Sequence, residues 1–420
     1  MPQTNKPANN SELSIYQKIK NNEKIPVFQT LNEATNKLIL KGQGAVAVTT
    51  ANNREFSIYL SASATEKFPG YALTVNQENA IFYRYEPENQ LIELKSELGV
   101  GIDSEKKCRY WLSIEKIKCS LDSINFRLRY GKGEQRKLNI LMEYTLADCK
   151  ASESWIEDIE HIHFNSIDIQ LGEIWRDPVT IEPPLLIFSR DAITMEMAAT
   201  YKGTVVENLT SECQKLYANV SGQQFQLNTP DFPDFSEAIK QSIQNPKGWC
   251  YQTLKNKEKE FGEANPDATY LRITLGVNQG ESPGIPYVLE IWPNGHYSPI
   301  HNHAGANAVI KVLHGEITVR LFDMLSVSHK TPFKTATIKE GDITWITPRL
   351  NQTHQLHNET PHTVCVTVQC YLYNIEDNFH YECFDYIDNN GKKIEKFLPN
   401  SDMDFLAFKE QMKKEWESSK

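Results

Sequence analysis

Residues 293–315 read PNGHYSPIHNHAGANAVIKVLHG, and this stretch decides the fold of the second half of the chain. Two histidines, His301 and His303, stand at the head of an apolar run, with Gly295 before them and Gly315 after it. On a strand, side chains two residues apart point to the same side. We therefore expect both imidazoles to face one point, and imidazole is the commonest metal ligand among side chains.

A third ligand is offered by residues 341–358, which read GDITWITPRLNQTHQLHN. His354 and His357 compete for this role, and the spacing to Asn358 favours His354. The two segments resemble the paired motifs of the cupin superfamily. The first has a Gly, His-x-His and a later Gly, and the second has a Gly, a Pro, a His and an Asn. The resemblance implies a double-stranded β-barrel with a metal inside.

The position that carries a glutamate ligand in many cupins is Ala308 here, which leaves three neutral histidines. In this respect residues 206–420 resemble the cysteine dioxygenase family of thiol dioxygenases. Tyr270-Leu-Arg272 is similar to the family's Tyr-x-Arg, which binds the substrate carboxylate. Thr367-Val-Gln369-Cys-Tyr371 is similar to its Ser-x-His-x-Tyr strand beside the iron.

The resemblance implies an iron(II)-dependent enzyme that oxidises L-cysteine to cysteine sulfinate with O₂, in cysteine catabolism and taurine biosynthesis. It implies Fe(2+) held by His301, His303 and His354. The implied substrate ligands are Tyr270, Arg272 and Tyr371, and the implied catalytic residues are Tyr371, Arg272, Gln369 and Thr367. Two departures matter. Gln369 cannot shuttle a proton as the family's His can, and Ala308 cannot form the thioether that a Cys there forms with the tyrosine.

Other readings stay open. In the closest alternative, the substrate is another thiol acid such as 3-mercaptopropionate. Arg272 favours a substrate with a carboxylate, which cysteamine lacks. A cupin oxygenase acting on carbon, or a non-enzymatic sensor or binding protein, are further alternatives. Arg349 is the substitute carboxylate anchor, and His296, His314 and Trp292 are expected to be structural.

The first half of the chain has the rhythm of a β-sandwich. Short runs rich in β-branched and aromatic residues are separated by turn-prone clusters between residues 29 and 176. Residues 1–28 are expected to be a disordered tail and residues 177–205, which contain PVTIEPP, a linker. The sandwich distantly resembles a farnesoic-acid-methyltransferase-like module, but it lacks a nucleotide-binding glycine loop. We expect it to serve in binding or oligomerisation.

The fold class predicted is therefore mainly β: an N-terminal β-sandwich, a helical segment and a C-terminal cupin barrel. Helical patterns occupy residues 209–220, 234–244, 249–262 and 403–420. The net charge of −10 argues against nucleic-acid partners. No apolar run is long enough to predict a membrane span, and we expect a soluble, cytoplasmic protein. The eight cysteines include no C-x-x-C pair and are expected to be buried thiols.

Overall fold

The computed structural model describes most of the chain in two units, Met1–Ile181 and Glu182–Lys420. The described residues are 36–50, 54–64, 69–85, 90–95, 99–103, 108–118, 124–146, 151–165, 169–179, 182–276, 287–373 and 383–419. The tail predicted for residues 1–28 lies outside these ranges.

The N-terminal unit is a sandwich of two five-stranded sheets. In sheet order, one contains β10 (Ile169–Trp175), β1 (Gly44–Thr50), β6 (Arg109–Lys118), β7 (Ile124–Lys132) and β8 (Ile140–Leu146). The other contains β5 (Gln90–Lys95), β4 (Ala80–Tyr85), β3 (Gly70–Val75), β2 (Phe56–Ser61) and β9 (His161–Phe164). Short 3₁₀ turns occupy Lys137–Asn139 and Ala151–Asp158. Val46, Phe82 and Leu112, from different strands, share one buried core, so the predicted sandwich is confirmed.

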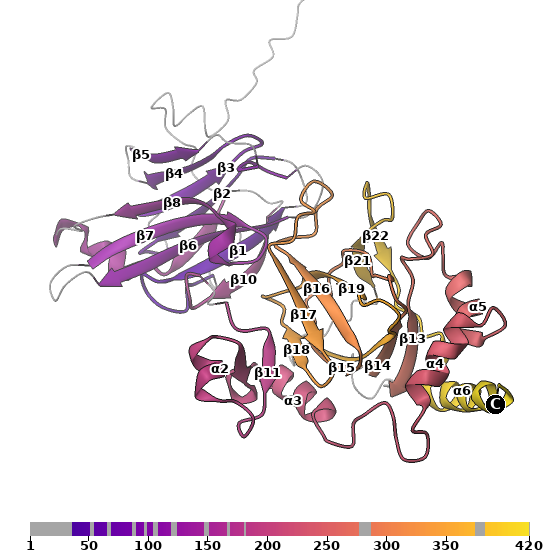
Figure 1. The fold of residues 1–420 in the computed structure, drawn as a ribbon. Coiled ribbons are helices and arrows are strands. Elements are labelled where there is room, and N and C mark those ends of the chain that lie inside the picture. The colour runs from indigo at the N-terminus through magenta and orange to yellow at the C-terminus, as the bar shows by residue number, and fades with distance from the viewer. Residues whose placement is uncertain are drawn as a thin grey trace, which may run out of the picture. The chain divides into compact units, whose positions relative to one another are not determined.

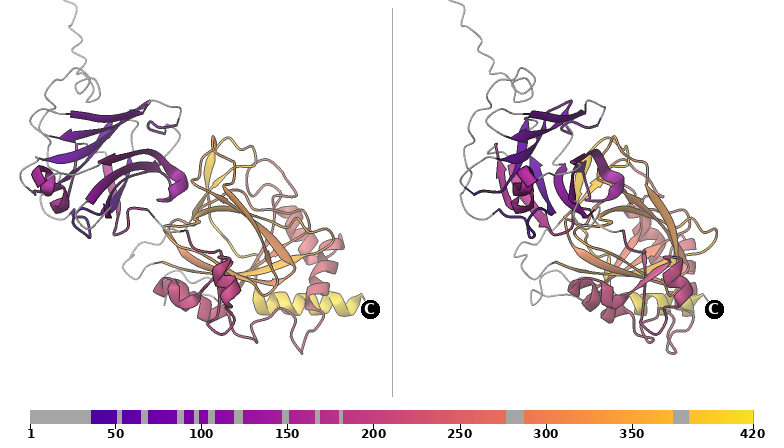
Figure 2. Two further views of the ribbon diagram at one scale, coloured as in Figure 1. Left: turned by 60° about the vertical axis from the view of Figure 1, so that its left-hand side comes forward. Right: turned by 90° about the vertical axis from the view of Figure 1, so that its left-hand side faces the viewer.

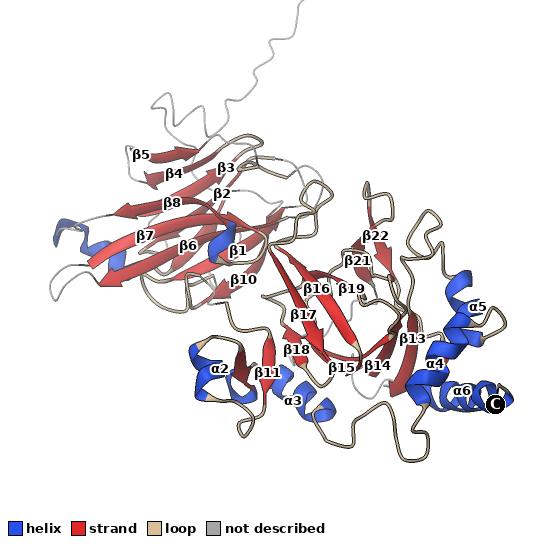
Figure 3. Ribbon diagram, viewed as in Figure 1, coloured by secondary structure: helices blue, strands red, loops and turns tan. Residues whose placement is uncertain are grey.

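The C-terminal unit is a double-stranded β-barrel built from a large and a small sheet (Figures 1 and 3). The large sheet runs β12 (Gly203–Val205), β11 (Leu186–Phe188), β18 (Ile343–Ile346), β15 (Asn307–His314), β20 (Cys365–Leu372), β14 (Tyr287–Trp292), β13 (Leu271–Gly276) and β23 (Met403–Asp404). The small sheet runs β17 (Lys334–Lys339), β16 (Glu316–Phe322) and β19 (Thr353–His357), and β21 (Phe384–Ile387) pairs with β22 (Ile394–Phe397). The predicted fold class is thereby confirmed.

Three helices gather on one side of the barrel, beside β13 (Figures 1 and 2). They are α4 (Phe235–Gln244), α5 (Trp249–Asn256) and α6 (Phe405–Ser418). Their apolar faces share a core with the outer face of β13 and β14. The shorter α2 (Met195–Ala199), the 3₁₀ turn Val206–Asn208 and α3 (Ser211–Val220) precede them. Among the described residues, no helix is both long enough and apolar enough to cross a bilayer.

The prediction that residues 177–205 form a linker is wrong for most of their length. β11 pairs with β12 in parallel and with β18 at Leu186–Thr344, so both short strands extend the large barrel sheet. Pro178, Pro183 and Pro184 precede β11, and the short helix α2 begins only after that strand. The C-terminal unit therefore begins before the predicted residue 206.

The inner face of the large sheet collects the polar residues singled out by the sequence. Directly paired residues on antiparallel strands point to the same face. Arg272 pairs with Glu290, and Glu290 pairs in turn with Thr367. Tyr371 lies further along β20 on the same face, opposite Ala308. The strand register therefore turns these side chains toward the interior of the barrel.

Candidate metal centre and its pocket

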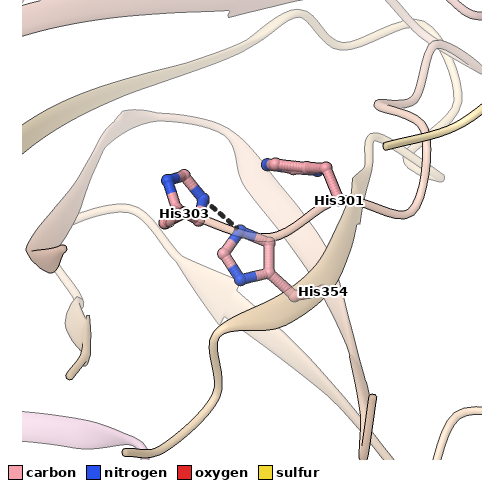
Figure 4. A group of neighbouring side chains, drawn as sticks. All are labelled: His301, His303 and His354. Atoms are coloured by element: carbon pink, nitrogen blue, oxygen red, sulfur yellow. Dashed lines mark hydrogen bonds between the residues drawn. The ribbon is translucent and has the colours of Figure 1, made fainter. Parts of the chain in front are cut away.

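Three histidines converge inside the barrel. One ring nitrogen from each of His301, His303 and His354 lies within 4.8 Å of the others, and Figure 4 shows the three rings turned toward one another. The His303 and His354 Nε2 atoms are 3.1 Å apart. Within the part of the chain that the structure describes, no carboxylate or thiol belongs to this group.

The local backbone explains how the rings meet. His354 lies on β19, and its backbone exchanges two hydrogen bonds of 3.0 Å with His301. His303 is not on a strand, because the chain turns there before β15, and the Ala306 amide donates to the His303 carbonyl. Strand alternation is therefore the wrong reason for their common direction. Instead, the backbone bridge between His301 and His354 and the tight turn at His303 bring the rings together.

Main-chain carbonyls fix which ring nitrogen carries the proton. His301 Nδ1 lies 2.9 Å from the Pro299 carbonyl, and His354 Nδ1 lies 3.2 Å from the Asn351 carbonyl. A carbonyl only accepts, so both Nδ1 atoms donate, and each Nε2 presents a bare lone pair to the centre of the group. Such outer contacts orient metal-ligating imidazoles in general.

Burial keeps these histidines neutral. His303 and His354 are each 1% exposed, and His301 is partly buried. Burial lowers the pKa of His354 to about 4 and the pKa of His303 well below its ordinary value. Burial and the neighbouring His354 also lower the pKa of His301. Three uncharged imidazoles that converge on one point fit a first-row divalent metal such as iron, zinc, copper or nickel.

A narrow pocket opens beside the histidines. Its walls are formed largely by aromatic rings from several elements: Phe261, Tyr270, Trp292, Tyr371, Phe384, Tyr386 and Phe397. Phe384 lies 4.6 Å from the His303 ring, between ring centroids, and Tyr371 stacks on the same ring at 5.2 Å. The polar lining consists of His301, His303, Arg272, Glu290 and Gln369. The arrangement excludes bulk water while leaving a few polar groups for a small ligand.

A chain of buried hydrogen bonds links Arg272 to Tyr371 along the pocket wall. Arg272 donates through a terminal nitrogen to Glu290 at 3.0 Å. Gln369 donates through Nε2 to the second oxygen of Glu290, and the Tyr371 hydroxyl donates to Gln369 Oε1. An ionised carboxylate can only accept. Glu290 therefore fixes the orientation of the Gln369 amide, and through it the direction in which the Tyr371 hydroxyl points its proton.

Arg272 and Glu290 each favour the charged form of the other, whereas burial disfavours both charges. Burial raises the pKa of Glu290 to about 7, although Arg272 acts against that shift. Burial opposes the charge of Arg272, but Glu290 raises its pKa above the ordinary value. Arg272 is 4% exposed and Glu290 3%. A buried ion pair of this kind leaves no net charge on the pocket wall when both partners are ionised.

All three predicted substrate residues, Tyr270, Arg272 and Tyr371, line the pocket, and among the predicted catalytic residues only Thr367 does not. Tyr270 stacks on Trp292 with ring centroids 4.2 Å apart, and burial raises the pKa of Tyr270 above its ordinary value. Thr367 is different, because its hydroxyl accepts a hydrogen bond from Trp292 Nε1 at 3.1 Å and it does not line the pocket. Thr367 therefore positions Trp292, a residue of the pocket wall.

The alternatives lie elsewhere. Arg349 is exposed in the turn after β18 and does not line the pocket. His357 packs edge-on against Tyr297, outside the histidine group. His296 bonds to Thr269, and His314 lies 3.4 Å from Glu340, as expected for structural histidines.

Glu290 is the site residue that the sequence analysis missed. A signal was available, because Glu290 interrupts the apolar run YVLEIW and has the same parity on the strand as Trp292. A charged residue in the middle of a buried strand is rarely unpaired. Its partner, however, depends on the register between β13 and β14, which the sequence does not state.

No protein-family model matches the chain. Among solved structures, the protein TT1209 from Thermus thermophilus is 19% identical, with 27% of this chain and 92% of that chain covered and a TM-score of 0.20. A cupin domain of an XRE family transcriptional regulator from Enterobacter cloacae is 13% identical (25% and 97% covered, TM-score 0.21). An oxalate oxidase in complex with glycolate is 17% identical (26% and 53% covered, TM-score 0.21). These similarities concern the fold alone.

Proposed function

We propose that the C-terminal unit is an iron(II)-dependent thiol dioxygenase that oxidises L-cysteine to cysteine sulfinate. The observation that carries this proposal is the group of three neutral histidines, without a carboxylate among the described residues, beside a pocket that holds Arg272 and Tyr371. Imidazole ligands suit iron, and a centre with three protein ligands keeps positions open. When bound there, ferrous iron would supply the redox chemistry between a thiolate and O₂.

The reaction balances without a further reductant. The thiol sulfur loses four electrons and O₂ gains them, and both oxygen atoms end on sulfur as a sulfinic acid. The protein's contribution is to hold the thiol and keep water away. Arg272 Nε is buried and finds no acceptor among the described residues, so it can donate to a substrate carboxylate. The aromatic walls exclude water from the sulfur.

Tyr371 has a restricted part in this scheme. Its hydroxyl proton is committed to Gln369, so its oxygen can accept a hydrogen bond from a ligand. Burial raises the pKa of Tyr371 well above its ordinary value, so the side chain stays a neutral phenol. Gln369 replaces the family's histidine and holds this orientation without moving a proton. We therefore assign Tyr371 to positioning the ligand near His303.

The test combines metal analysis with oxygen uptake. Full-length protein reconstituted with ferrous iron should consume O₂ only when cysteine is present, and the product should carry two added oxygen atoms by mass spectrometry. His354→Ala should lose both iron and uptake, whereas His357→Ala, on the same strand but outside the histidine group, should keep both. Iron binding without uptake for any thiol would overturn the proposal in favour of a binding role.

A further inference from the structure

The charged lining of the pocket consists of one cation and one anion. Among the residues that line it, only Arg272 and Glu290 carry a full charge, and their side chains meet at 3.0 Å. Both are almost completely buried. The histidines that line it add no charge of their own when they hold a metal, because imidazole binds metals in its neutral form. The pocket wall therefore carries no net charge, but it presents a positive group at Arg272 and a negative group at Glu290.

Behind the wall lie one lysine and two carboxylates that contact it. Lys257 lies 3.0 Å from Asp402 and 3.4 Å from Glu260. None of these three residues lines the pocket. Asp402 also accepts a hydrogen bond from the Arg272 backbone amide at 2.7 Å, which ties β13 to the C-terminal segment. This contact fixes the Arg272 backbone, while Nε of its guanidinium keeps no acceptor among the described residues.

Each charged group retains capacity for a ligand. Arg272 Nε is buried, and within the described ranges no acceptor reaches it. Each oxygen of Glu290 accepts one hydrogen bond in the contacts above, from Arg272 and from Gln369, and a carboxylate oxygen can accept a second. The Tyr371 oxygen is a further acceptor, because its proton points to Gln369. The pocket thus offers a donor at Arg272 and acceptors at Glu290 and Tyr371.

Building on the proposed function, we propose that Glu290 is a specificity-determining residue that selects thiols with a zwitterionic α-amino-acid head. The ammonium group would contact Glu290 and Tyr371, and the carboxylate would contact the free edge of Arg272. A ligand bearing only one of these charges leaves the opposite wall charge uncompensated in a buried site, which is costly. The pocket therefore discriminates against thiol acids and aminothiols alike.

Three thiols of matched length separate these cases: L-cysteine, 3-mercaptopropionate and cysteamine. Their binding to iron(II)-loaded, full-length protein is measured by calorimetry without oxygen, at about pH 8, where Glu290 and Arg272 are both ionised. We expect the wild type to bind L-cysteine at least about tenfold more tightly than either of the others, as a difference of one buried charge requires. Oxygen uptake with each thiol is recorded separately.

Charge-changing variants test the cause. Glu290→Gln leaves Arg272 unbalanced and should shift the preference toward 3-mercaptopropionate by about tenfold or more. Arg272→Met leaves Glu290 unbalanced and should shift it toward cysteamine. The matched control is Glu340→Gln, an exposed glutamate in the turn before β18, which should leave all three affinities unchanged. If a single variant does not fold, the neutral double variant Glu290→Gln/Arg272→Met should lose the preference for a zwitterion.

The outcomes separate this inference from the proposed function. Equal affinity ratios in wild type and Glu290→Gln would overturn the role of Glu290, even if cysteine is oxidised normally. A wild type that binds 3-mercaptopropionate as tightly as L-cysteine would overturn it as well. Conversely, the predicted binding pattern without oxygen uptake would support the charge selection while removing the dioxygenase.

Discussion

Acidification should destabilise the metal-free protein through its buried histidines. His303 and His354 are neutral in the fold, where burial lowers the pKa of His354 to about 4, but they take up protons in the unfolded chain below about pH 6.5. The unfolded state then binds more protons than the folded state, so the free energy of unfolding falls as the pH falls. The stabilisation is complete above about pH 6.5 and is lost toward the folded pKa.

The size of the effect follows from the pKa difference. Each such histidine removes about 1.4 kcal/mol per pH unit inside this window, or about 2 kcal/mol between pH 6.5 and 5. The two buried histidines together therefore remove about 4 kcal/mol over that range. Burial and the neighbouring His354 lower the pKa of His301 to about 3, so His301 adds a further loss in the same direction. A loss of this size is a large part of the stability of an ordinary domain.

The assay is urea unfolding of chelator-treated, full-length protein at several pH values, followed by near-ultraviolet circular dichroism. His354→Gln cannot take up a proton, so its stability should fall less steeply with acid, by about 1.4 kcal/mol per pH unit. His329→Gln, at an exposed position between β16 and β17, is the control and should keep the wild-type slope. An unchanged slope in His354→Gln would refute the reasoning.

Three further predictions concern the stability of the barrel and of its C-terminal helix. Thr367→Val removes the acceptor of Trp292 Nε1 and should cost about 1–3 kcal/mol in urea unfolding, whereas Thr367→Ser keeps the bond and should cost less. Oxygen uptake by folded Thr367→Val at saturating thiol should stay near the wild-type rate. Loss of this uptake would show that Thr367 contacts the reacting atoms. Ala308→Leu overfills the position opposite Tyr371 and should cost about 1–3 kcal/mol while iron content is retained. Asp404→Ala removes the side chain that caps α6 at the Ala407 amide and should cost about 1 kcal/mol, with Asp404→Asn as the control that keeps a cap.

The metal centre could be predicted because its residues carry chemistry and are bracketed by turn glycines. Gly315, for example, has a φ of +73°, and an added Cβ would lie 2.8 Å from the Val364 carbonyl oxygen. Only glycine suits such a turn between two barrel strands. The strand rhythm of both units was also readable, since each run combines β-branched or aromatic residues with a turn-prone end.

The partners of individual side chains could not be read in the same way. The Arg272–Glu290 pair depends on how β13 aligns with β14, and the sequence between them, residues 277–286, is too long for the two-residue hairpin loop that would predict a register. β11 and β12 are three residues long, too short to show a periodic signal. The sequence predicts a catalytic role for Thr367 because it does not show that the Thr367 hydroxyl accepts a hydrogen bond from Trp292. That contact appears only when β14 and β20 are placed side by side.

The two carbonyls that set the ring tautomers of His301 and His354 belong to the main chain at Pro299 and Asn351. A side-chain substitution leaves a main-chain oxygen where it is, unless the chain itself is displaced. Ligand geometry is thus insulated from mutation of the surrounding wall. The charged residues of the pocket can therefore be substituted without changing the atoms that orient these two rings, and a change of substrate need not disturb the histidine group.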